Sequence, residues 1–261
     1  MAKIHLNNCE FHYELRGKGP PVILIAGYTC NHSFWDPILK SLSQKFQILT
    51  FDNRAVGQTK DNQEKLSAEL MAEDVMALAE ALQLVRPHIA GHSMGGTIAQ
   101  CIGAKYSPKI SKLAILSSSP KWRSALILST RSLLEMRRQN CPFDLVAEAT
   151  LPWIFGENFL NNRQAVEELK TTALNYPFPQ SIQDQERQHS VLTQFDGRHQ
   201  LQKILAKTLI VYGSQDVAAL PCESKYMAKS IPQNILKELD CGHGMILEQP
   251  EQLAELLGVF F

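Results

Sequence analysis

A serine, an aspartate and a histidine in this chain have neighbours that suit nucleophilic acyl transfer. The serine stands in the pattern Gly91-His92-Ser93-Met94-Gly95, where a short apolar segment turns into a stretch rich in small residues. The glycines permit a strained turn that lifts the hydroxyl clear of a sheet. Because a hydroxyl is a weak nucleophile until a base takes its proton, a histidine and a carboxylate are needed beside it.

Position in the chain identifies the base and the carboxylate. Catalytic groups are expected at the carboxyl ends of parallel strands. The segment 91–95 resembles the serine turn of α/β-hydrolases, and that resemblance implies the chain order serine, acid, histidine. Asp216 follows the apolar segment 208–212, and His243 lies between two glycines after the segment 234–239. We therefore predict a catalytic triad in which Ser93 attacks, His243 transfers the proton and Asp216 orients the histidine ring.

Other acids and histidines fit these roles less well. Asp52 ends a predicted strand but precedes Ser93 in the chain, and Asp240 is too close to His243 in sequence to brace its ring from across a crevice. His92 occupies the variable position of the serine turn and is expected to pack locally. His32 follows another predicted turn and is a further candidate to face the site.

Two backbone N–H groups must also point at the charge that develops on the acyl oxygen. The first is assigned to Met94, directly after the nucleophile, and the second to Tyr28, in the turn that Gly27 permits after the segment 22–27. Candidate substrate-binding residues are Gly27, Trp122, Trp153 and Phe155. The aromatic side chains suit apolar walls of a pocket, and a place in the core fits them equally well.

The elements that must position these residues alternate between strand and helix over residues 1–119 and again from residue 201. Continuous apolar runs such as 22–27 are typical of strands that are buried on both faces. Steps of three or four residues between apolar positions predict a helix from the N-cap Ser67 to Leu82. This alternation indicates an α/β fold with a mostly parallel sheet between two layers of helices.

Residues 120–200 break the alternation and are expected to form helices alone. We interpret them as a helical cap inserted into a core domain of residues 1–119 and 201–261. The predicted cap helices are Ser124–Arg138, Phe143–Leu151, Arg163–Ala173 and Ile182–Gln194. The cap is expected to lie over the crevice at the ends of the strands and to set substrate choice, while the core supplies the chemistry.

Composition narrows the classes of function and partner. The 26 basic residues balance the 26 acidic ones without a basic block, which argues against nucleic acid. No apolar run reaches membrane-spanning length, and residues 1–5 lack the core of a signal peptide, so we expect no membrane partner and a cytoplasmic location. The six scattered cysteines suit reduced thiols. No metal or nucleotide motif is visible, and the expected state is a monomer or homodimer.

The chain resembles the capped members of the α/β-hydrolase superfamily over nearly its whole length. Segment 91–96 matches their nucleophile turn, loop 52–59 resembles their D-x-R-G-x-G-x-S motif, and the surroundings of Asp216 and His243 resemble their acid and histidine motifs. Segments 195–198 and 151–155 are most similar to proteins described as 3-oxoadipate enol-lactonase-like. The chain departs from the usual pattern at Ala26, Ala55, Thr59 and Lys207.

The resemblance implies an α/β-hydrolase fold with an eight-stranded sheet and an inserted helical cap. It also implies a cofactor-independent serine hydrolase that cleaves a small ester, lactone or related acyl substrate through an acyl-enzyme. Because Ala26 and Ala55 depart from the family pattern, the substrates of individual family members are not carried over to this chain. Two alternatives stay open, namely a ligand-sensing receptor of this fold with slow or no turnover, and a C–C bond hydrolase or cofactor-free haloperoxidase or perhydrolase-like enzyme.

Overall fold

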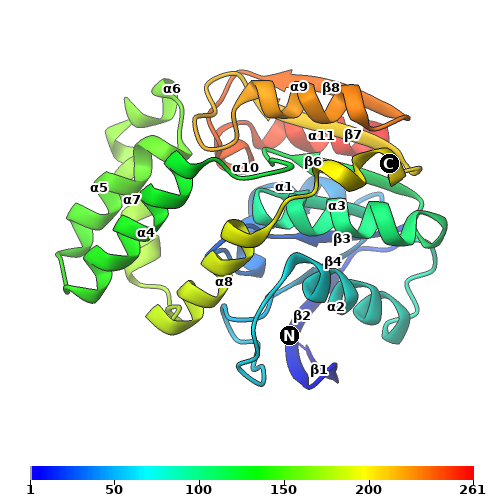
Figure 1. Ribbon diagram of the computed structural model, residues 1–261, viewed down its shortest axis with the longest axis horizontal. Helices are drawn as coiled ribbons and strands as arrows, with labels where there is room; N and C mark the ends of the chain where they lie inside the picture. The colour runs from blue at the N-terminus through cyan, green and yellow to red at the C-terminus, as the bar shows by residue number, and fades with distance from the viewer. Residues whose placement is uncertain (1) are drawn as a thin grey trace.

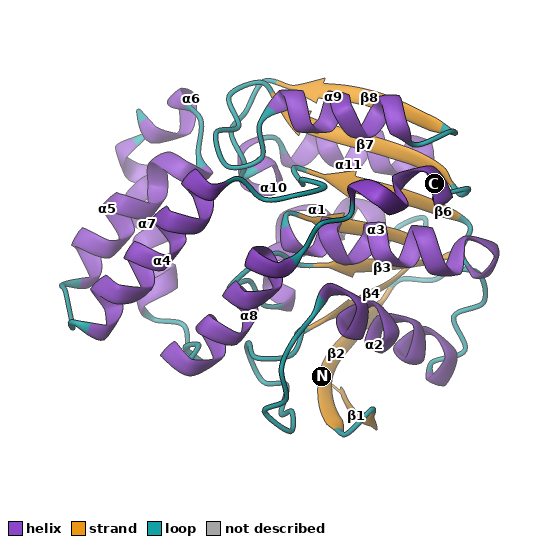
Figure 2. Cartoon of the chain, viewed as in Figure 1, coloured by secondary structure: helices purple, strands orange, loops and turns teal. Residues whose placement is uncertain are grey.

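The computed structural model describes residues 2–261, which form an eight-stranded sheet between two layers of helices (Figures 1 and 2). The strands are β1 (Ala2–Leu6), β2 (Cys9–Arg16), β3 (Pro21–Ile25), β4 (Gln47–Phe51), β5 (His88–His92), β6 (Lys112–Leu116), β7 (Lys207–Gly213) and β8 (Asn234–Leu239). Their order is β1-β2-β4-β3-β5-β6-β7-β8. The pairs β1–β2 and β2–β4 are antiparallel and the other pairs are parallel. The predicted fold class is therefore confirmed.

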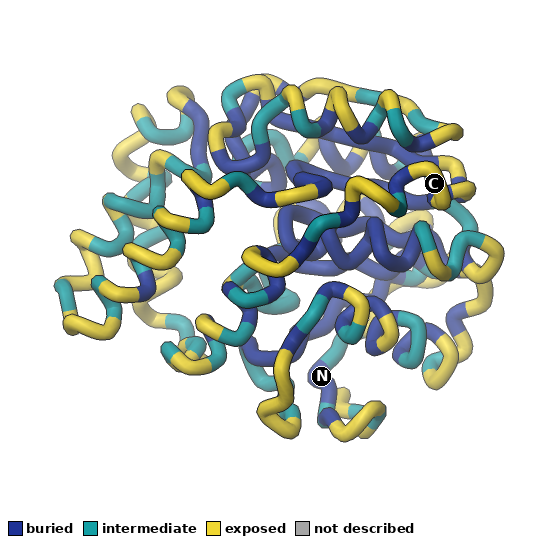
Figure 3. Tube along the Cα trace, viewed as in Figure 1, coloured by how far each residue is buried: buried dark blue, intermediate teal, exposed yellow. Residues whose placement is uncertain are grey.

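The central strands of the sheet are buried on both faces, and the two faces contribute to separate apolar cores. Along β3, Val22 and Leu24 belong to one core, whereas Ile23 and Ile25 belong to the other, as the alternation of a strand requires. Figure 3 shows the middle of the molecule as its most deeply buried part, and the central strands β3 to β7 lie there, whereas the edge strands β1 and β8 are largely exposed or half-buried. The continuous apolar run in the sequence is explained by this two-sided burial.

Helices close each face of the sheet. One face is covered by α1 (Asp36–Leu42), α10 (Met245–Glu248) and α11 (Pro250–Phe260), and the other by α2 (Ala68–Ala81), α3 (Met94–Tyr106) and α9 (Pro221–Ser230). The short 3₁₀ helices are η1 (His32–Trp35), η2 (Ser107–Lys109) and η3 (Arg198–Lys203). No helix within residues 2–261 combines the length and apolar character needed to cross a bilayer.

A further group of helices, the α4–α8 region, lies between β6 and β7 in the chain. Its members are α4 (Ser124–Arg138), α5 (Phe143–Ile154), α6 (Glu157–Leu160), α7 (Arg163–Leu174) and α8 (Ile182–Gln194). In Figure 1, α4 to α7 project to the left of the sheet and α8 returns toward it. The bounds of α4 and α8 agree with the predicted helices, but α6 was not predicted.

The end of α5 differs from the prediction. Pro152 was expected to stop the helix at Leu151, yet the helix continues to Ile154. The last turn is held from both sides, because the Phe155 N–H donates to the Leu151 carbonyl (2.9 Å) and the Ile154 carbonyl accepts from the Gly244 N–H (2.7 Å). A tertiary contact therefore outweighs the local preference of the proline.

A buried ion pair fixes the loop after β4. The Arg54 guanidinium donates through Nε to Asp74 Oδ2 (2.6 Å) and through Nη2 to Asp74 Oδ1 (2.9 Å) on α2. Nη2 also donates to the carbonyl of Asn7 (2.7 Å), in the turn between β1 and β2. One arginine thus ties the loop to a helix and to the first hairpin.

We expect Arg54→Met to lower the free energy of unfolding by about 3–5 kcal/mol, because it leaves the Asp74 carboxylate buried without its partner. Equilibrium unfolding in urea measures the change. Arg198→Met removes an exposed arginine that pairs with Asp196, and it should leave the transition nearly unchanged. Equal shifts in the two variants would contradict a special role for the buried pair.

Candidate active site

The turn that carries Ser93 joins β5 to α3. Ser93 has φ 55° and ψ −118°, a strained backbone conformation for a residue with a side chain. Its N–H donates to the Leu116 carbonyl of the neighbouring strand β6 (2.9 Å). A Cβ on Gly91 would collide with the Gly95 carbonyl oxygen, and one on Gly95 would collide with that of Ile25. Close packing around the turn therefore requires the two glycines.

The structure brings Ser93, His243 and Asp216 together from three separate elements. His243 Nε2 lies 2.8 Å from Ser93 Oγ, and His243 Nδ1 lies 2.9 Å from Asp216 Oδ2. Because a carboxylate only accepts, Nδ1 carries the proton and Nε2 accepts from the serine hydroxyl. The relative exposures of these residues are 9%, 5% and 2%, so little water competes for the bonds.

The other oxygen of Asp216 is fully engaged by the backbone. Asp216 Oδ1 accepts from the N–H groups of Ala218 (2.9 Å) and Ala219 (2.8 Å). These bonds set the rotation of the carboxylate and leave Oδ2 for the histidine. The arrangement can draw a proton from Ser93 and stabilise the imidazolium that results.

Both residues expected to donate to an oxyanion lie beside Ser93. Met94 is the first residue of α3, where backbone N–H groups have no partner inside the helix. Tyr28 lies in a turn closed by the Cys30 N–H and the Gly27 carbonyl (3.2 Å). A Cβ on Gly27 would lie only 3.1 Å from Ser93 Cβ, so the backbone of this turn passes directly against the nucleophile.

The acids that were set aside in the sequence make other bonds. Asp240 Oδ1 accepts from the Ser214 hydroxyl (3.1 Å) and the Gln215 amide (2.8 Å). Asp52 Oδ1 lies 2.7 Å from His32 Nδ1 and accepts from the His32 N–H (2.8 Å). His32 therefore faces Asp52, and the carboxylate next to His243 is that of Asp216.

His32 also belongs to a cluster with His12 and Glu14 in which the nearest ligand atoms lie within 4.8 Å of one another. His12 and Glu14 share one face of β2, as residues two apart in a strand do. The distance from His32 Nε2 to Glu14 Oε1 is 3.9 Å, whereas ligands of a tetrahedral zinc ion lie about 3.3 Å apart. The hydrogen bond to Asp52 raises the pKa of His32, whose ring also lies near the Glu14 carboxylate.

His92 has a part in the site that the sequence did not indicate. Its Nε2 donates to the backbone carbonyl of His243 (2.8 Å), and its ring lies between those of Phe34 and His243, with centroids 4.9 Å from each. Burial lowers the pKa of His92 to about 3, so the ring is neutral. The prediction of local packing was incomplete, because the bond spans 151 residues of sequence.

Glu248 links the His243 loop to the end of α5. Its carboxylate accepts from the N–H groups of Gly242 (3.0 Å) and Gly156 (2.9 Å). Burial raises the pKa of this carboxyl group. The glutamate five residues after His243 was not singled out in the sequence, since nothing there indicates that Gly156 lies nearby.

The aromatic candidates occupy different places. Phe155 is buried with its ring against Gly244, where a Cβ would lie 2.6 Å from the ring, and it stacks on Phe159 at a centroid distance of 4.1 Å. Trp153 is half-buried and packs on the core that contains α3. The Trp122 indole is buried and donates to Thr97 Oγ1 of α3 (3.1 Å). Phe155 is thus the candidate that packs directly beside the His243 loop.

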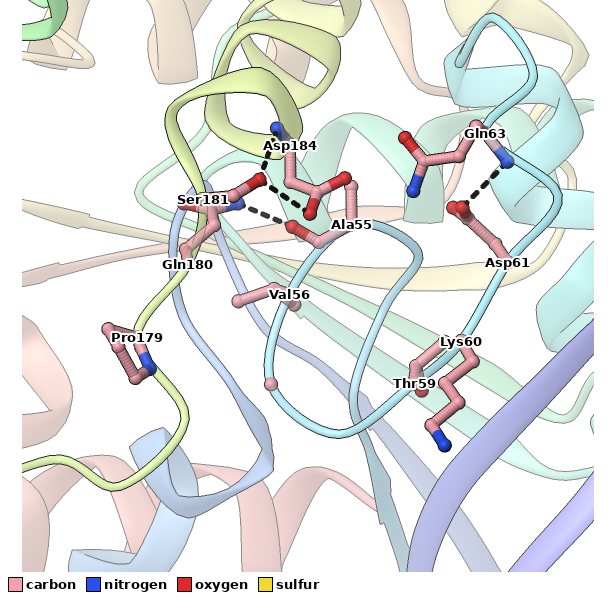
Figure 4. Close-up of a pocket in the computed structure, with 11 residues that line it drawn as sticks. Ala55, Val56, Thr59, Lys60, Asp61, Gln63, Pro179, Gln180, Ser181 and Asp184 are labelled. Atoms are coloured by element: carbon pink, nitrogen blue, oxygen red, sulfur yellow. Dashed lines mark hydrogen bonds between the residues drawn. The ribbon is translucent and has the colours of Figure 1, made fainter. Parts of the chain in front are cut away.

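A cavity of about 260 Å³ lies between the loop after β4 and the segment that leads into α8 (Figure 4). Its lining includes Ala55, Lys60, Asp61, Gln180 and Asp184. Two of these lining residues are bonded to each other, since the Gln180 side-chain amide donates to the Ala55 carbonyl (2.6 Å). The cavity therefore borders the contact between the α4–α8 region and the core.

Comparison with known proteins gives the same picture of the fold. A protein family described as "alpha/beta hydrolase fold" matches residues 20–250. The chain is 26% identical over 246 residues to 3-oxoadipate enol-lactonase 1 of Acinetobacter baylyi, covering 92% of this chain and 88% of the relative. The enol-lactonase of Burkholderia xenovorans LB400 aligns over 99% of both chains at a TM-score of 0.88 and 20% identity. A thermophilic esterase of Thermogutta terrifontis aligns over 100% of this chain and 98% of its own at a TM-score of 0.84 and 23% identity.

Proposed function

This chain belongs to the alpha/beta hydrolase fold family and is a hydrolase, and from that premise we propose that it cleaves small esters or lactones through an acyl-enzyme on Ser93. The observation that carries the proposal is the pair of bonds made by the His243 ring, 2.8 Å to Ser93 Oγ and 2.9 Å to Asp216 Oδ2. A serine hydroxyl with a braced imidazole at this distance is equipped for nucleophilic attack.

The proposed reaction has two halves. Ser93 Oγ attacks the acyl carbon while His243 takes the hydroxyl proton, and the oxyanion is held by the N–H groups of Tyr28 and Met94. The C–O bond to the leaving group then breaks, and His243 returns the proton to the departing alkoxide. Water repeats the sequence on the acyl-enzyme, which releases the acid and regenerates Ser93.

The substrate class rests on the named relatives and on the place of the site. The relatives are an enol-lactonase and an esterase, so a lactone or small ester is the simplest common substrate. We propose that residues 120–200 act as a cap, and that substrate lies between it and the sheet, near Gly27, Trp122, Trp153 and Phe155.

The six cysteines carry free thiols, which supports a cytoplasmic location.

A screen of p-nitrophenyl esters, lactones and thioesters tests the function, with Ser93→Ala as the control. The proposal expects many turnovers by the wild-type protein and at least about 10⁴-fold slower turnover by the variant. A stoichiometric burst without turnover would favour the ligand-sensing alternative. Turnover that survives in Ser93→Ala would overturn the serine mechanism.

Trp153→Ala should change the preference among ester chain lengths. Removing the indole enlarges an apolar wall, and one methylene in such a pocket is worth about 1–3 kcal/mol, so the ratio of kcat/KM values should shift up to about 100-fold in favour of longer acyl chains. A series from acetate to octanoate esters measures the ratio. Phe143→Ala, at an exposed aromatic residue of the same helix, should leave the preference unchanged. An identical profile in Trp153→Ala and wild type would exclude Trp153 from the pocket wall.

A further inference from the structure

Gln188 of α8 connects the α4–α8 region to the turn that carries Tyr28. The Thr29 N–H donates to Gln188 Oε1 (2.9 Å), and Gln188 Nε2 donates to the Arg54 carbonyl (2.8 Å). Because an N–H only donates and a carbonyl only accepts, these partners fix which way the side-chain amide faces. Gln188 is 0% exposed, so bulk water does not compete for either bond.

The turn has a strained residue at the point that Gln188 holds. Thr29 has φ 63°, in the left-handed region that β-branched residues rarely adopt. Such strain persists only where surrounding contacts impose it. The turn itself contributes the bond between the Cys30 N–H and the Gly27 carbonyl, and Gln188 supplies the contact to Thr29 from outside the turn.

A neighbouring glutamine secures Gln188 in turn. The Gln180 amide donates to Gln188 Oε1 (3.1 Å) and to the Ala55 carbonyl (2.6 Å). The second of these bonds joins two residues that line the cavity in Figure 4. The carbonyls of Arg54 and Ala55 belong to the loop that the buried Arg54–Asp74 pair holds to α2. The side chain of Gln188 is thus bonded to a loop that is itself fixed to the core, so Gln188 restrains the position of the Thr29 backbone.

We propose that Gln188 is a positioning residue for the oxyanion turn, acting through Thr29 to aim the N–H of Tyr28. The inference rests on the proposed function, in which Tyr28 is one of the two oxyanion donors. It departs from the expectation that residues 120–200 set substrate choice alone. One helix of that region contributes to the chemistry, although it contains no triad residue.

The first test compares Gln188→Met with Leu192→Ala. Gln188→Met keeps the length of the side chain and removes its polar groups. Leu192 is buried on the same helix, so Leu192→Ala destabilises α8 but leaves the bond between Gln188 and Thr29 intact. Gln188→Met should lower kcat about 10- to 100-fold with little change in KM, less than the roughly 100- to 1,000-fold cost of losing an oxyanion donor. Labelling of Ser93 by a fluorophosphonate should slow in parallel. Leu192→Ala should retain both rates.

Two further measurements separate positioning from a structural effect. Hydrogen exchange at the Thr29 amide should accelerate in Gln188→Met while the amides of α3 keep their protection. Adding Thr29→Gly should restore part of kcat in the Gln188→Met background, because glycine adopts a positive φ without steric cost.

Unchanged labelling and turnover in folded Gln188→Met would overturn the inference, as would equal losses in Leu192→Ala. A failure of the proposed function would give different results from a failure of this inference. In that case Ser93→Ala would keep the activity of the wild-type protein, or the wild-type protein would not react with the fluorophosphonate. The Thr29 exchange rate would still report whether Gln188 holds the turn.

Discussion

Ser93→Ala and His243→Ala should each remove nearly all ester hydrolysis, and the double variant should be hardly worse than either single one. The triad acts as a unit, because Ser93 is a weak nucleophile without its base and His243 has no serine hydroxyl to activate in Ser93→Ala. We expect each loss to be about 10⁴- to 10⁶-fold in kcat, with the residual rate supplied by the oxyanion donors and by substrate binding.

Steady-state kinetics on the best ester from the screen measures these losses, and circular dichroism checks that each variant is folded. His5→Ala, at an exposed histidine of β1, is the matched control and should keep full activity. Losses that add in the double variant would show that the two side chains do not share a proton-transfer step.

Asp216→Asn should slow turnover by about 10⁴-fold while the protein stays folded. The N–H groups of Ala218 and Ala219 need an acceptor, so they hold the amide oxygen of the new side chain and turn its NH₂ group toward His243. An NH₂ donor selects the ring form that carries its proton on Nε2. In that form Nε2 cannot accept the proton of Ser93.

The comparison with Asp240→Asn makes the test specific. Asp240 lies three residues from His243 in sequence but bonds Ser214 and Gln215, so its replacement should leave kcat within a few-fold of the wild type. Thermal unfolding of both variants controls for folding. Near-full activity in Asp216→Asn, together with a large loss in Asp240→Asn, would reverse the assignment of the acid.

The strands and most helices could be predicted because their signals are local. The run at 22–25 reads as a strand buried on both faces, and Ser67 caps α2 by accepting from the Leu70 N–H (3.1 Å). The errors lie where distant contacts decide the local structure. The end of α5 passes Pro152 because the His243 loop holds its last carbonyl, and the four-residue helix α6 has no periodicity to detect.

The same limit applies to the candidate site. Ser93, Asp216 and His243 could be chosen because each follows a strand, and parallel strands deliver their ends to one edge of the sheet. Gln188 could not be chosen, because its bond to Thr29 joins residues 159 apart and a buried glutamine on a helix has no pattern of its own. The partners of such residues become visible only once the elements are packed.

The double attachment of the α4–α8 region bears on protein engineering. Ile154, at the end of α5, accepts from the Gly244 N–H of the His243 loop, and the Gly156 N–H, just after α5, donates to Glu248 of α10. Helix α8 is bonded to the Tyr28 turn through Gln188. A chimaera that receives this region from a relative would have to inherit compatible partners at both junctions. Grafts that exchange the helices and ignore these few backbone contacts should yield folded proteins with impaired catalysis for every ester tried, rather than enzymes with a new preference.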